Sequence, residues 1–301
     1  MTLTTRYFRA DDSGPRLLVT GGVHGDEFES ILAIRRLIRL FDGDDPLVSG
    51  SVNFVPVVNE GAFFRGHRCA DDGLDLARTC PGRRDGSATE QVAAALSDLI
   101  RASTHYIDLH TGGTELSVFP LAGFCLVSDP DILAKQRRMA RAFNLPVVWG
   151  TSANLEGRTL SVARDAGVPA IYCEYLGSAT RSKDGVEAYF DGVLNVMAEL
   201  GMIHRSRPSS RVEQIVEDNR TGSGHMQVCH PAPMDGCFEP AIALGDHVEK
   251  GQVIGHVLDL IGEVKLPISA DESGRLIVLR TFPRVRNGDS VGVILPDLSP
   301  A

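Results

Sequence analysis

The chain has 301 residues, of which 43% are hydrophobic and 23% are charged, a composition typical of a globular protein with an ordinary core. Its 39 acidic residues outnumber its 30 Lys and Arg residues, so the formal net charge is −9. An acidic chain of this kind is not built to bind nucleic acid or an anionic membrane through bulk charge. A local basic pocket for a small anion remains compatible with this composition.

The sequence predicts neither a secretory signal nor a membrane span. Residues 1–12 contain no apolar core of the kind that signal peptides have, and no run is long and apolar enough to cross a bilayer. The six cysteines form no Cys-x-x-Cys pair and no dense framework, which indicates reduced thiols. We therefore expect a cytoplasmic protein, and the sequence leaves its oligomeric state open, a homo-oligomer included.

The first two-thirds of the chain alternates short apolar runs with segments of helical periodicity. The predicted strands are residues 17–20, 52–58, 106–109, 146–149 and 170–173. The predicted helices are residues 28–41, 91–100, 131–143 and 185–200. Buried strands separated by amphipathic helices predict an α/β fold with a mostly parallel, mixed sheet and flanking helices. Ligands of such sheets bind at the carboxyl ends of the strands.

The composition changes after residue 204. Residues 205–224 are charged and carry Pro and Ser, which predicts a linker between an α/β domain over residues 1–204 and a β-rich domain over residues 225–301. In the β-rich part the motif Gly-Asp-His-Val at 245–248 returns as Gly-Asp-Ser-Val at 288–291.

This C-terminal part resembles the barrel-sandwich fold of biotinyl and lipoyl domains, which present a modifiable lysine at a hairpin tip. Here the corresponding residues, 260–263, are Leu-Ile-Gly-Glu, and Lys265 lies past the tip. We expect an unmodified all-β domain that packs beside the first domain or makes an oligomer contact.

Two motifs at predicted strand ends indicate a metal site. His24 and Glu27 lie three residues apart in a glycine-flanked segment that leads into the first helix, so an imidazole and a carboxylate can point the same way. His110 ends another predicted strand. Two histidines, one glutamate and an open fourth position form the ligand set of catalytic zinc in carboxypeptidase-type enzymes. Asp108 lies on the same side of its strand as His110, where it can accept a hydrogen bond from an imidazole N–H and fix its tautomer.

Each motif has an ordinary structural explanation when it is taken alone. His-x-x-Glu also describes a helix N-terminus with an acidic first turn. A second possible metal group, Cys229 and Cys237 with His225 or His230, fits no established ligand spacing. The combination of two glycine-flanked motifs at two strand ends is what favours a metal site at His24, Glu27 and His110.

The motifs, in this order, resemble the succinylglutamate desuccinylase/aspartoacylase family, a branch of the zinc carboxypeptidase-like fold. The resemblance covers nearly the whole chain and is carried by Gly-Val-His-Gly-Asp-Glu at 22–27, Val-Pro-Val-Val-Asn at 55–59, Arg-Gly-His-Arg at 65–68, Asp-Gly-Leu-Asp-Leu-Ala-Arg at 72–78, Pro-Gly at 81–82, Asp-Leu-His at 108–110 and Cys-Glu-Tyr at 173–175.

The resemblance implies roles for individual residues. His24, Glu27 and His110 would hold one zinc ion per chain. Glu174 would be the general base and proton shuttle, and Arg68 would polarise the scissile carbonyl. Arg78 would bind a substrate carboxylate. Beyond what the resemblance implies, Arg65, Asn59 and Arg158 are also expected to bind substrate.

The chain departs from the family pattern at two positions. Ala77 stands where the family usually has Asn in Asp-Leu-Asn-Arg, and Ala77 cannot donate the hydrogen bond of an amide side chain. Cys80 replaces the aromatic residue that usually precedes Pro-Gly. These changes bear on which substrate is accepted more than on the chemistry.

The residues themselves suit amide hydrolysis. Arg68 and Arg78 belong to a loop region rich in arginine, and a planar guanidinium binds a carboxylate through two parallel hydrogen bonds. Arg158 precedes a helix that leads to the Glu174 strand, where a substrate carboxylate or a structural ion pair would explain it equally well. Glu174 lies at the rim of the sheet where the metal ligands are expected, a place suited to acid–base catalysis.

The sequence thus predicts a zinc-dependent hydrolase that cleaves the amide bond of a small N-acylated amino acid. The acyl group is expected to be small, such as acetyl or succinyl, and N-acetylated diamino acids are among the candidates. Two alternatives remain open. The first is a zinc carboxypeptidase that acts on short peptides, and the second is a zinc-binding protein that has lost catalysis.

Overall fold

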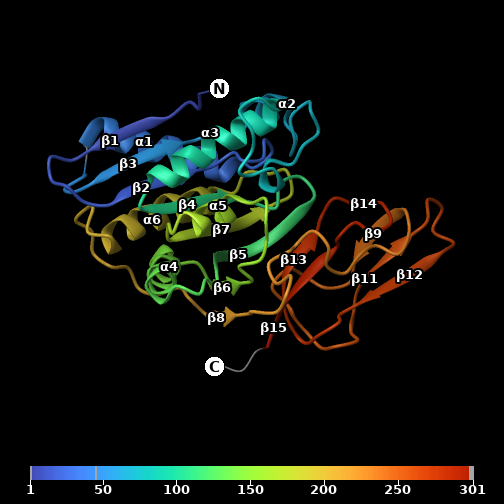
Figure 1. The fold of residues 1–301 in the computed structure, drawn as a ribbon. Coiled ribbons are helices and arrows are strands. Elements are labelled where there is room, and N and C mark those ends of the chain that lie inside the picture. Colours follow the sequence, from blue (N-terminus) through green and yellow to red (C-terminus); the bar gives the residue numbers. More distant parts are fainter. Residues whose placement is uncertain (1, 45, 298–301) are drawn as a thin grey trace.

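The computed structural model describes residues 2–44 and 46–297, and in these ranges the chain folds into a helix-covered sheet and a smaller β-rich part (Figure 1). The helices are α1 (Phe28–Asp44), α2 (Glu60–Arg65), η1 (a 3₁₀ turn, Leu76–Arg78), α3 (Ala88–Ala102), α4 (Pro130–Phe143), α5 (Thr159–Asp165) and α6 (Lys183–Glu199). The strands of the first 217 residues are β1 (Arg6–Arg9), β2 (Arg16–Thr20), β3 (Ser51–Val55), β4 (His105–His110), β5 (Leu116–Cys125), β6 (Val147–Thr151), β7 (Ala170–Gly177) and β8 (Gln214–Glu217).

The parallel centre of the large sheet has the order β3-β2-β4-β7. Side chains alternate between the two faces of each strand. Leu17 and Val19 of β2 pack with α1, α4 and α6, whereas Leu18 packs with α3 and α5 on the opposite face. Helices therefore cover both faces, and the predicted class, a mostly parallel mixed α/β sheet with flanking helices, is confirmed.

Strand β5 joins this sheet to the C-terminal part of the chain. It runs antiparallel to β7, and its residues 121–125 pair with β6 while residues 116–118 pair with β13 (Gly274–Arg280). Strands β10 (His247–Val248) and β15 (Gly292–Pro296) pair with β13 in turn. In Figure 1, β5 runs from the helix-covered part toward the orange and red strands.

The remaining C-terminal strands form a separate antiparallel sheet. Its order is β12 (Lys265–Ser269), β11 (Val253–Leu258), β9 (Gly236–Pro240) and β14 (Arg284–Val285). A distinct core that includes Phe238, Val257 and Leu276 fills the space between this sheet and β13. The all-β character predicted for the C-terminal part is thus observed in the described residues.

The junction between the two parts differs from a simple linker. Within residues 205–224, β8 adds to the large sheet as a parallel neighbour of β6. The division at residues 204 and 225 remains a prediction about domains, but hydrogen bonding through β8 and β13 makes the sheet continuous across it.

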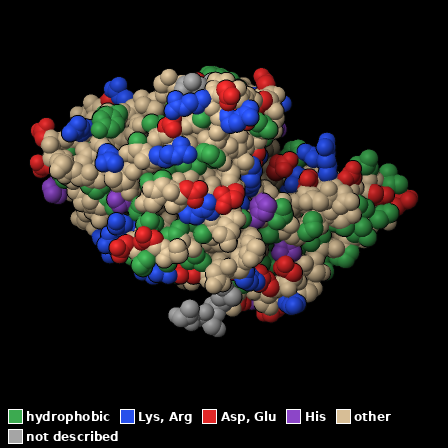
Figure 2. Space-filling model, viewed as in Figure 1, with side chains coloured by type: hydrophobic (Ala, Val, Ile, Leu, Met, Phe, Trp, Pro, Cys, Tyr) green, Lys and Arg blue, Asp and Glu red, His purple; other side chains and the backbone are tan. Residues whose placement is uncertain are grey.

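The far end of the β-rich part exposes apolar side chains (Figure 2). Leu260 is 95% exposed and Ile261 is 76% exposed at the turn between β11 and β12, a turn that contains no lysine. Among the described residues, no helix is long and apolar enough to cross a membrane.

Close packing of α6 on α4 predicts a specific sensitivity to volume. A methyl group at Gly192 would lie 2.4 Å from the ring of Phe143, which is buried, whereas a methyl group at Gly43, also helical, would meet nothing within 4 Å. We expect Gly192→Ala to lower the free energy of unfolding by about 1–3 kcal/mol. Gly43→Ala should leave it unchanged or raise it by up to about 1 kcal/mol. Urea denaturation of both variants checks this, and equal midpoints would contradict the packing described.

Candidate metal centre and substrate pocket

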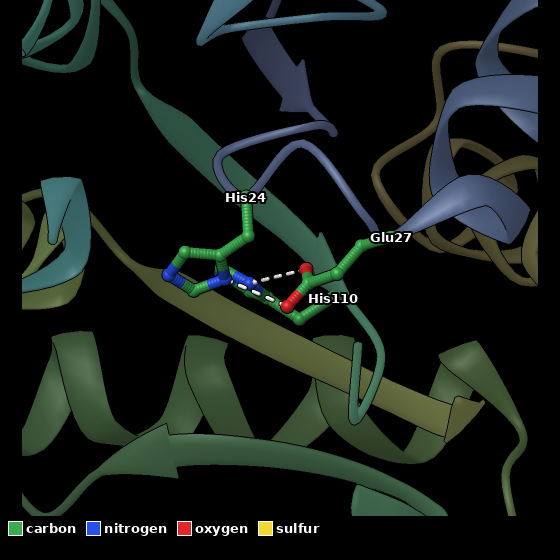
Figure 3. Close-up of side chains that lie close together, drawn as sticks. All are labelled: His24, Glu27 and His110. Atoms are coloured by element: carbon green, nitrogen blue, oxygen red, sulfur yellow. Dashed lines mark hydrogen bonds and ion pairs between the residues drawn. The ribbon is translucent and has the colours of Figure 1, made fainter. Parts of the chain in front are cut away.

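The predicted metal ligands come from two neighbouring parallel strands. The loop after β2 carries His24 and ends at Glu27, directly before α1, and His110 is the last residue of β4. Because β2 and β4 pair in parallel, their carboxyl ends meet at one edge of the sheet. Figure 3 shows the three side chains converging there, and all three are buried.

The three side chains have the arrangement that a metal ion requires. One ligand atom from each lies within 4.8 Å of the others. The Glu27 carboxylate is central: its Oε1 lies 2.6 Å from Nδ1 of His24, and its Oε2 lies 3.0 Å from Nδ1 of His110. Two imidazoles and one carboxylate with the same inward orientation could hold a divalent metal ion.

Both imidazoles turn their other nitrogen to a carboxylate. Nε2 of His24 lies 3.1 Å from Oδ1 of Asp75, and Nε2 of His110 lies 3.1 Å from Oδ2 of Asp108. Such carboxylate contacts fix the ring orientation and the tautomer, and they make the ligating nitrogen more basic. This arrangement presents Nδ1 of each histidine to the metal position and supports the metal-site interpretation.

The carboxylate of Asp108 is itself held by hydroxyl groups. Thr20 Oγ1 donates to Oδ1 at 2.7 Å, and Thr159 Oγ1 donates to Oδ2 at 2.5 Å. Asp75 accepts hydrogen bonds from the Ala77 backbone N–H at 2.9 Å and from Arg68 Nη2 at 2.9 Å. Asp108 was anticipated in this role from the sequence, whereas Asp75 was not, although it stands in the same motif as Arg78.

Opposite charges set the protonation of the cluster. Burial opposes ionisation of Glu27, but His24 and His110 hold its pKa well below the usual range. Burial likewise opposes a charged His110, yet Asp108 and Glu27 raise its pKa well above the ordinary value. A cation enclosed by these residues is therefore favoured, whether it is a proton or a metal ion.

Glu174 lies beside the cluster on β7. Its backbone is in register with His110, its side chain lines the same pocket, and it is 6% exposed. Burial raises the pKa of Glu174 to about 8, and the negative charge of Glu27 adds to this effect. Among the described residues, its Oε2 has no hydrogen-bond partner. A buried carboxyl group with a raised pKa and a free oxygen is suited to take up and release a proton near neutral pH.

The pocket next to the cluster has a volume of about 70 Å³ and contains three arginines, Arg68, Arg78 and Arg158. Arg78 donates to the side-chain oxygen of Gln227, and Arg158 Nη1 donates to the backbone oxygen of Gly224 at 3.1 Å. Burial and the charge of Arg158 lower the pKa of Arg78 to about 10. Within the described part of the chain, neither Arg78 nor Arg158 has a carboxylate partner, so the pocket is suited to an anion.

Two residues expected to bind substrate lie outside the lining of this pocket. Arg65 donates to the backbone oxygen of Ala70 at 2.7 Å, and its Nε lies 3.7 Å from the exposed carboxylate of Asp71. Asn59 is the N-cap of α2 and accepts a hydrogen bond from the Ala62 N–H at 3.1 Å. The structure gives both residues contacts that support the loop and α2, and their contact with substrate remains a prediction.

The segment Gly224–Gln227 forms part of the pocket wall, which the sequence did not reveal. Gly224, Met226 and Gln227 line the pocket although they lie in or next to the predicted linker. No motif marks them, because their role arises from the return of the chain through β8 to the edge of the sheet.

Comparison with known proteins identifies the family. The model of the succinylglutamate desuccinylase/aspartoacylase catalytic domain matches residues 13–200. The chain belongs to this family. Its desuccinylase/aspartoacylase domain therefore contains all three candidate ligands, Glu174 and the pocket arginines.

Several known proteins are similar to this chain over most of its length. An N-alpha-acetyl-L-2,4-diaminobutyric acid deacetylase of Halomonas elongata is 31% identical over 93% of this chain and 82% of its own length. The succinylglutamate desuccinylase/aspartoacylase structure from Rhodobacter sphaeroides has a TM-score of 0.86 at 26% identity, covering 98% of this chain and 89% of that one. The product-bound ectoine utilization protein EutE (DoeB) from Ruegeria pomeroyi has a TM-score of 0.87 at 26% identity, covering 96% and 87%.

The contact between Asp75 and His24 leads to a test of the metal centre. Asp75→Asn removes the negative charge behind His24 and the partner of Arg68, so we expect zinc affinity to fall by about 10-fold to 100-fold. Asp71→Asn, on the same loop with a fully exposed carboxylate, is the matched control and should bind zinc as the parent does. Competition with a chromophoric chelator measures both affinities. An unchanged affinity in Asp75→Asn would show that this carboxylate does not support the centre.

Proposed function

We propose that this chain is a zinc-dependent deacylase that hydrolyses the amide bond of a small N-acylated amino acid. The observation that carries this proposal is the position of Glu174, a buried carboxyl group with a raised pKa beside the His24–Glu27–His110 cluster and inside the arginine-lined pocket. The family membership supports the same reaction class, since its members are named for deacylation.

His24, Glu27 and His110 would hold the ion, with Asp75 and Asp108 behind the two histidines. A zinc ion held there would polarise a carbonyl oxygen and lower the pKa of a water molecule from 15.7 to about 7. Three protein ligands would leave a fourth position of the ion for water or substrate.

Glu174 would move the proton. Its carboxylate takes a proton from the attacking water, and its carboxylic acid gives that proton to the nitrogen of the departing amine. The raised pKa matters because a group that titrates near neutral pH can do both. Among the described residues its Oε2 accepts no hydrogen bond, so this oxygen would be available for the water or the amine.

Arg68 would stabilise the negative charge that develops on the carbonyl oxygen. Its Nε and Nη2 are fixed by Oδ2 of Asp75, and its Nη1 lies 3.4 Å from Nδ1 of His24, next to the metal position. A cation held in advance at this place contributes to catalysis without reorganising during the reaction.

Arg78 and Arg158 would bind the carboxylate of the amino-acid half. They are the pocket guanidinium groups that lack a carboxylate partner in the described structure, and their mutual repulsion is relieved by an anion between them. N-acetylated diamino acids are candidate substrates, because the Halomonas elongata relative is named for one. A cytoplasmic location also remains a prediction.

Amine release from a substrate panel tests the proposed reaction. The zinc-loaded protein is given N-acetyl, N-succinyl and N-formyl amino acids, with unacylated dipeptides alongside. We expect turnover of one acylated class, and we expect Glu174→Gln to lower kcat by about 10²-fold to 10⁴-fold while zinc remains bound. Cleavage of dipeptides alone would show a carboxypeptidase. No turnover despite one zinc per chain would favour a binding protein that has lost catalysis.

The carboxylate-binding role of Arg78 has its own test. We expect Arg78→Gln to raise KM about 10-fold or more with a smaller change in kcat, since a charged hydrogen bond to the ground state is lost. Arg83→Gln is the matched control, because Arg83 lies in the same region but is exposed beside Glu90 and Asp85. Steady-state kinetics on the best panel substrate measures both variants, and equal KM values would remove Arg78 from the substrate site.

A further inference from the structure

One buried polar group in the pocket is not used by the mechanism above. Tyr172 lies on β7, two residues before Glu174, so both side chains project from the same face of the strand. Tyr172 is 8% exposed and lines the pocket, yet its hydroxyl has no hydrogen-bond partner among the described residues. A buried hydroxyl without a partner is costly, and tyrosine hydroxyls are usually paired when buried.

The Tyr172 ring packs against a glycine of the neighbouring strand. Gly123 on the neighbouring strand β5 packs directly against the ring, since a methyl group there would lie 2.2 Å from Cε1 and Cζ. A larger residue at position 123 would displace the ring. The ring and its hydroxyl therefore lie against β5, in space that the absence of a side chain at Gly123 provides.

Tyr172, Glu174 and Arg158 line the same pocket, and burial and the charge of Glu174 raise the pKa of Tyr172 while the charge of Arg158 opposes this. If Glu174 protonates the leaving amine, the amine nitrogen lies at Glu174, and the α-carboxylate is attached one carbon away. Arg158, whose guanidinium has no acidic partner in the described structure, marks the place of that carboxylate. The Tyr172 hydroxyl would then reach the same carboxylate.

We propose that Tyr172 is a substrate-recognition residue whose hydroxyl donates a hydrogen bond to the α-carboxylate of the N-acyl amino acid, beside Arg158. This inference rests on the proposed deacylase function and extends it by one specificity-determining residue. The charge of Arg158 decides the chemistry of the ligand group, because an ammonium group placed here would be repelled and an apolar group would leave the hydroxyl unpaired.

The test compares Tyr172→Phe with the parent. The change removes one oxygen that has no partner in the described protein, so the melting temperature should stay the same or rise. KM for the best N-acyl amino acid should rise about 10-fold to 100-fold, the usual effect of losing a hydrogen bond to a charged group, with kcat within about threefold. Tyr175→Phe, in the same strand but on the opposite face, should change neither constant.

A second substrate identifies the group that is bound. In the analogue, a carboxamide replaces the α-carboxylate. For this analogue, the KM values of the parent and of Tyr172→Phe should differ by less than about threefold. The same comparison is made by calorimetric binding in the Glu174→Gln background, so that the result does not depend on turnover. A Tyr172→Phe protein with parental affinity for the N-acyl amino acid would overturn the inference. A Tyr172→Phe protein that loses as much affinity for the carboxamide as for the N-acyl amino acid would also overturn it. Failure of the parent itself to turn over any substrate would count against the proposed function and leave the binding comparison to decide the role of Tyr172.

Discussion

A buried carboxylate between two imidazoles is the constraint on which the site depends. Glu27 is 1% exposed, and its charge is tolerable there only because His24 and His110 face its two oxygens. Asp75 and Asp108 continue the alternation of charge behind the histidines, and hydroxyl groups or Arg68 satisfy these outer carboxylates. Each group therefore offsets the cost of burying the charge next to it. A divalent cation at the centre would complete the charge balance.

The sheet delivers these groups to one edge, and hydrophobic periodicity was sufficient to predict its centre. The apolar runs of β2, β4 and β7 and the helical pattern of α1 and α6 are strong because these elements are buried on both faces or along one long stripe. Strand β5 was not predicted, since Pro120 and Gly123 weaken its pattern. Strand β8 has four residues in a polar segment and is defined by its pairing with β6, which no local signal reveals.

Some residues of the site could be predicted from the sequence and others could not. The sequence was sufficient to predict His24, Glu27, His110 and Asp108. Their motifs stand at the ends of predicted parallel strands, and these ends meet at one edge of the sheet. Asp75 and the wall segment Gly224–Gln227 reach the site only through tertiary folding. Tyr172 could not be predicted as a site residue for another reason. A tyrosine in a strand is ordinarily a core residue, and only the unpartnered hydroxyl seen in the described structure distinguishes Tyr172 from one. The resemblance to the family supplied Glu174, Arg68 and Arg78. The structure places Arg78 and Arg158 in the lining of the pocket and Arg65 outside it.

The most direct test of the metal centre is anomalous diffraction from a crystal of the zinc-loaded protein, recorded on both sides of the zinc absorption edge. We expect one anomalous peak per chain, about 2.0–2.2 Å from Nδ1 of His24, a carboxylate oxygen of Glu27 and Nδ1 of His110. A chain that shows no peak at these three residues, or whose zinc lies at Cys229, Cys237 or another group, would contradict the central claim that this cluster is the catalytic metal site.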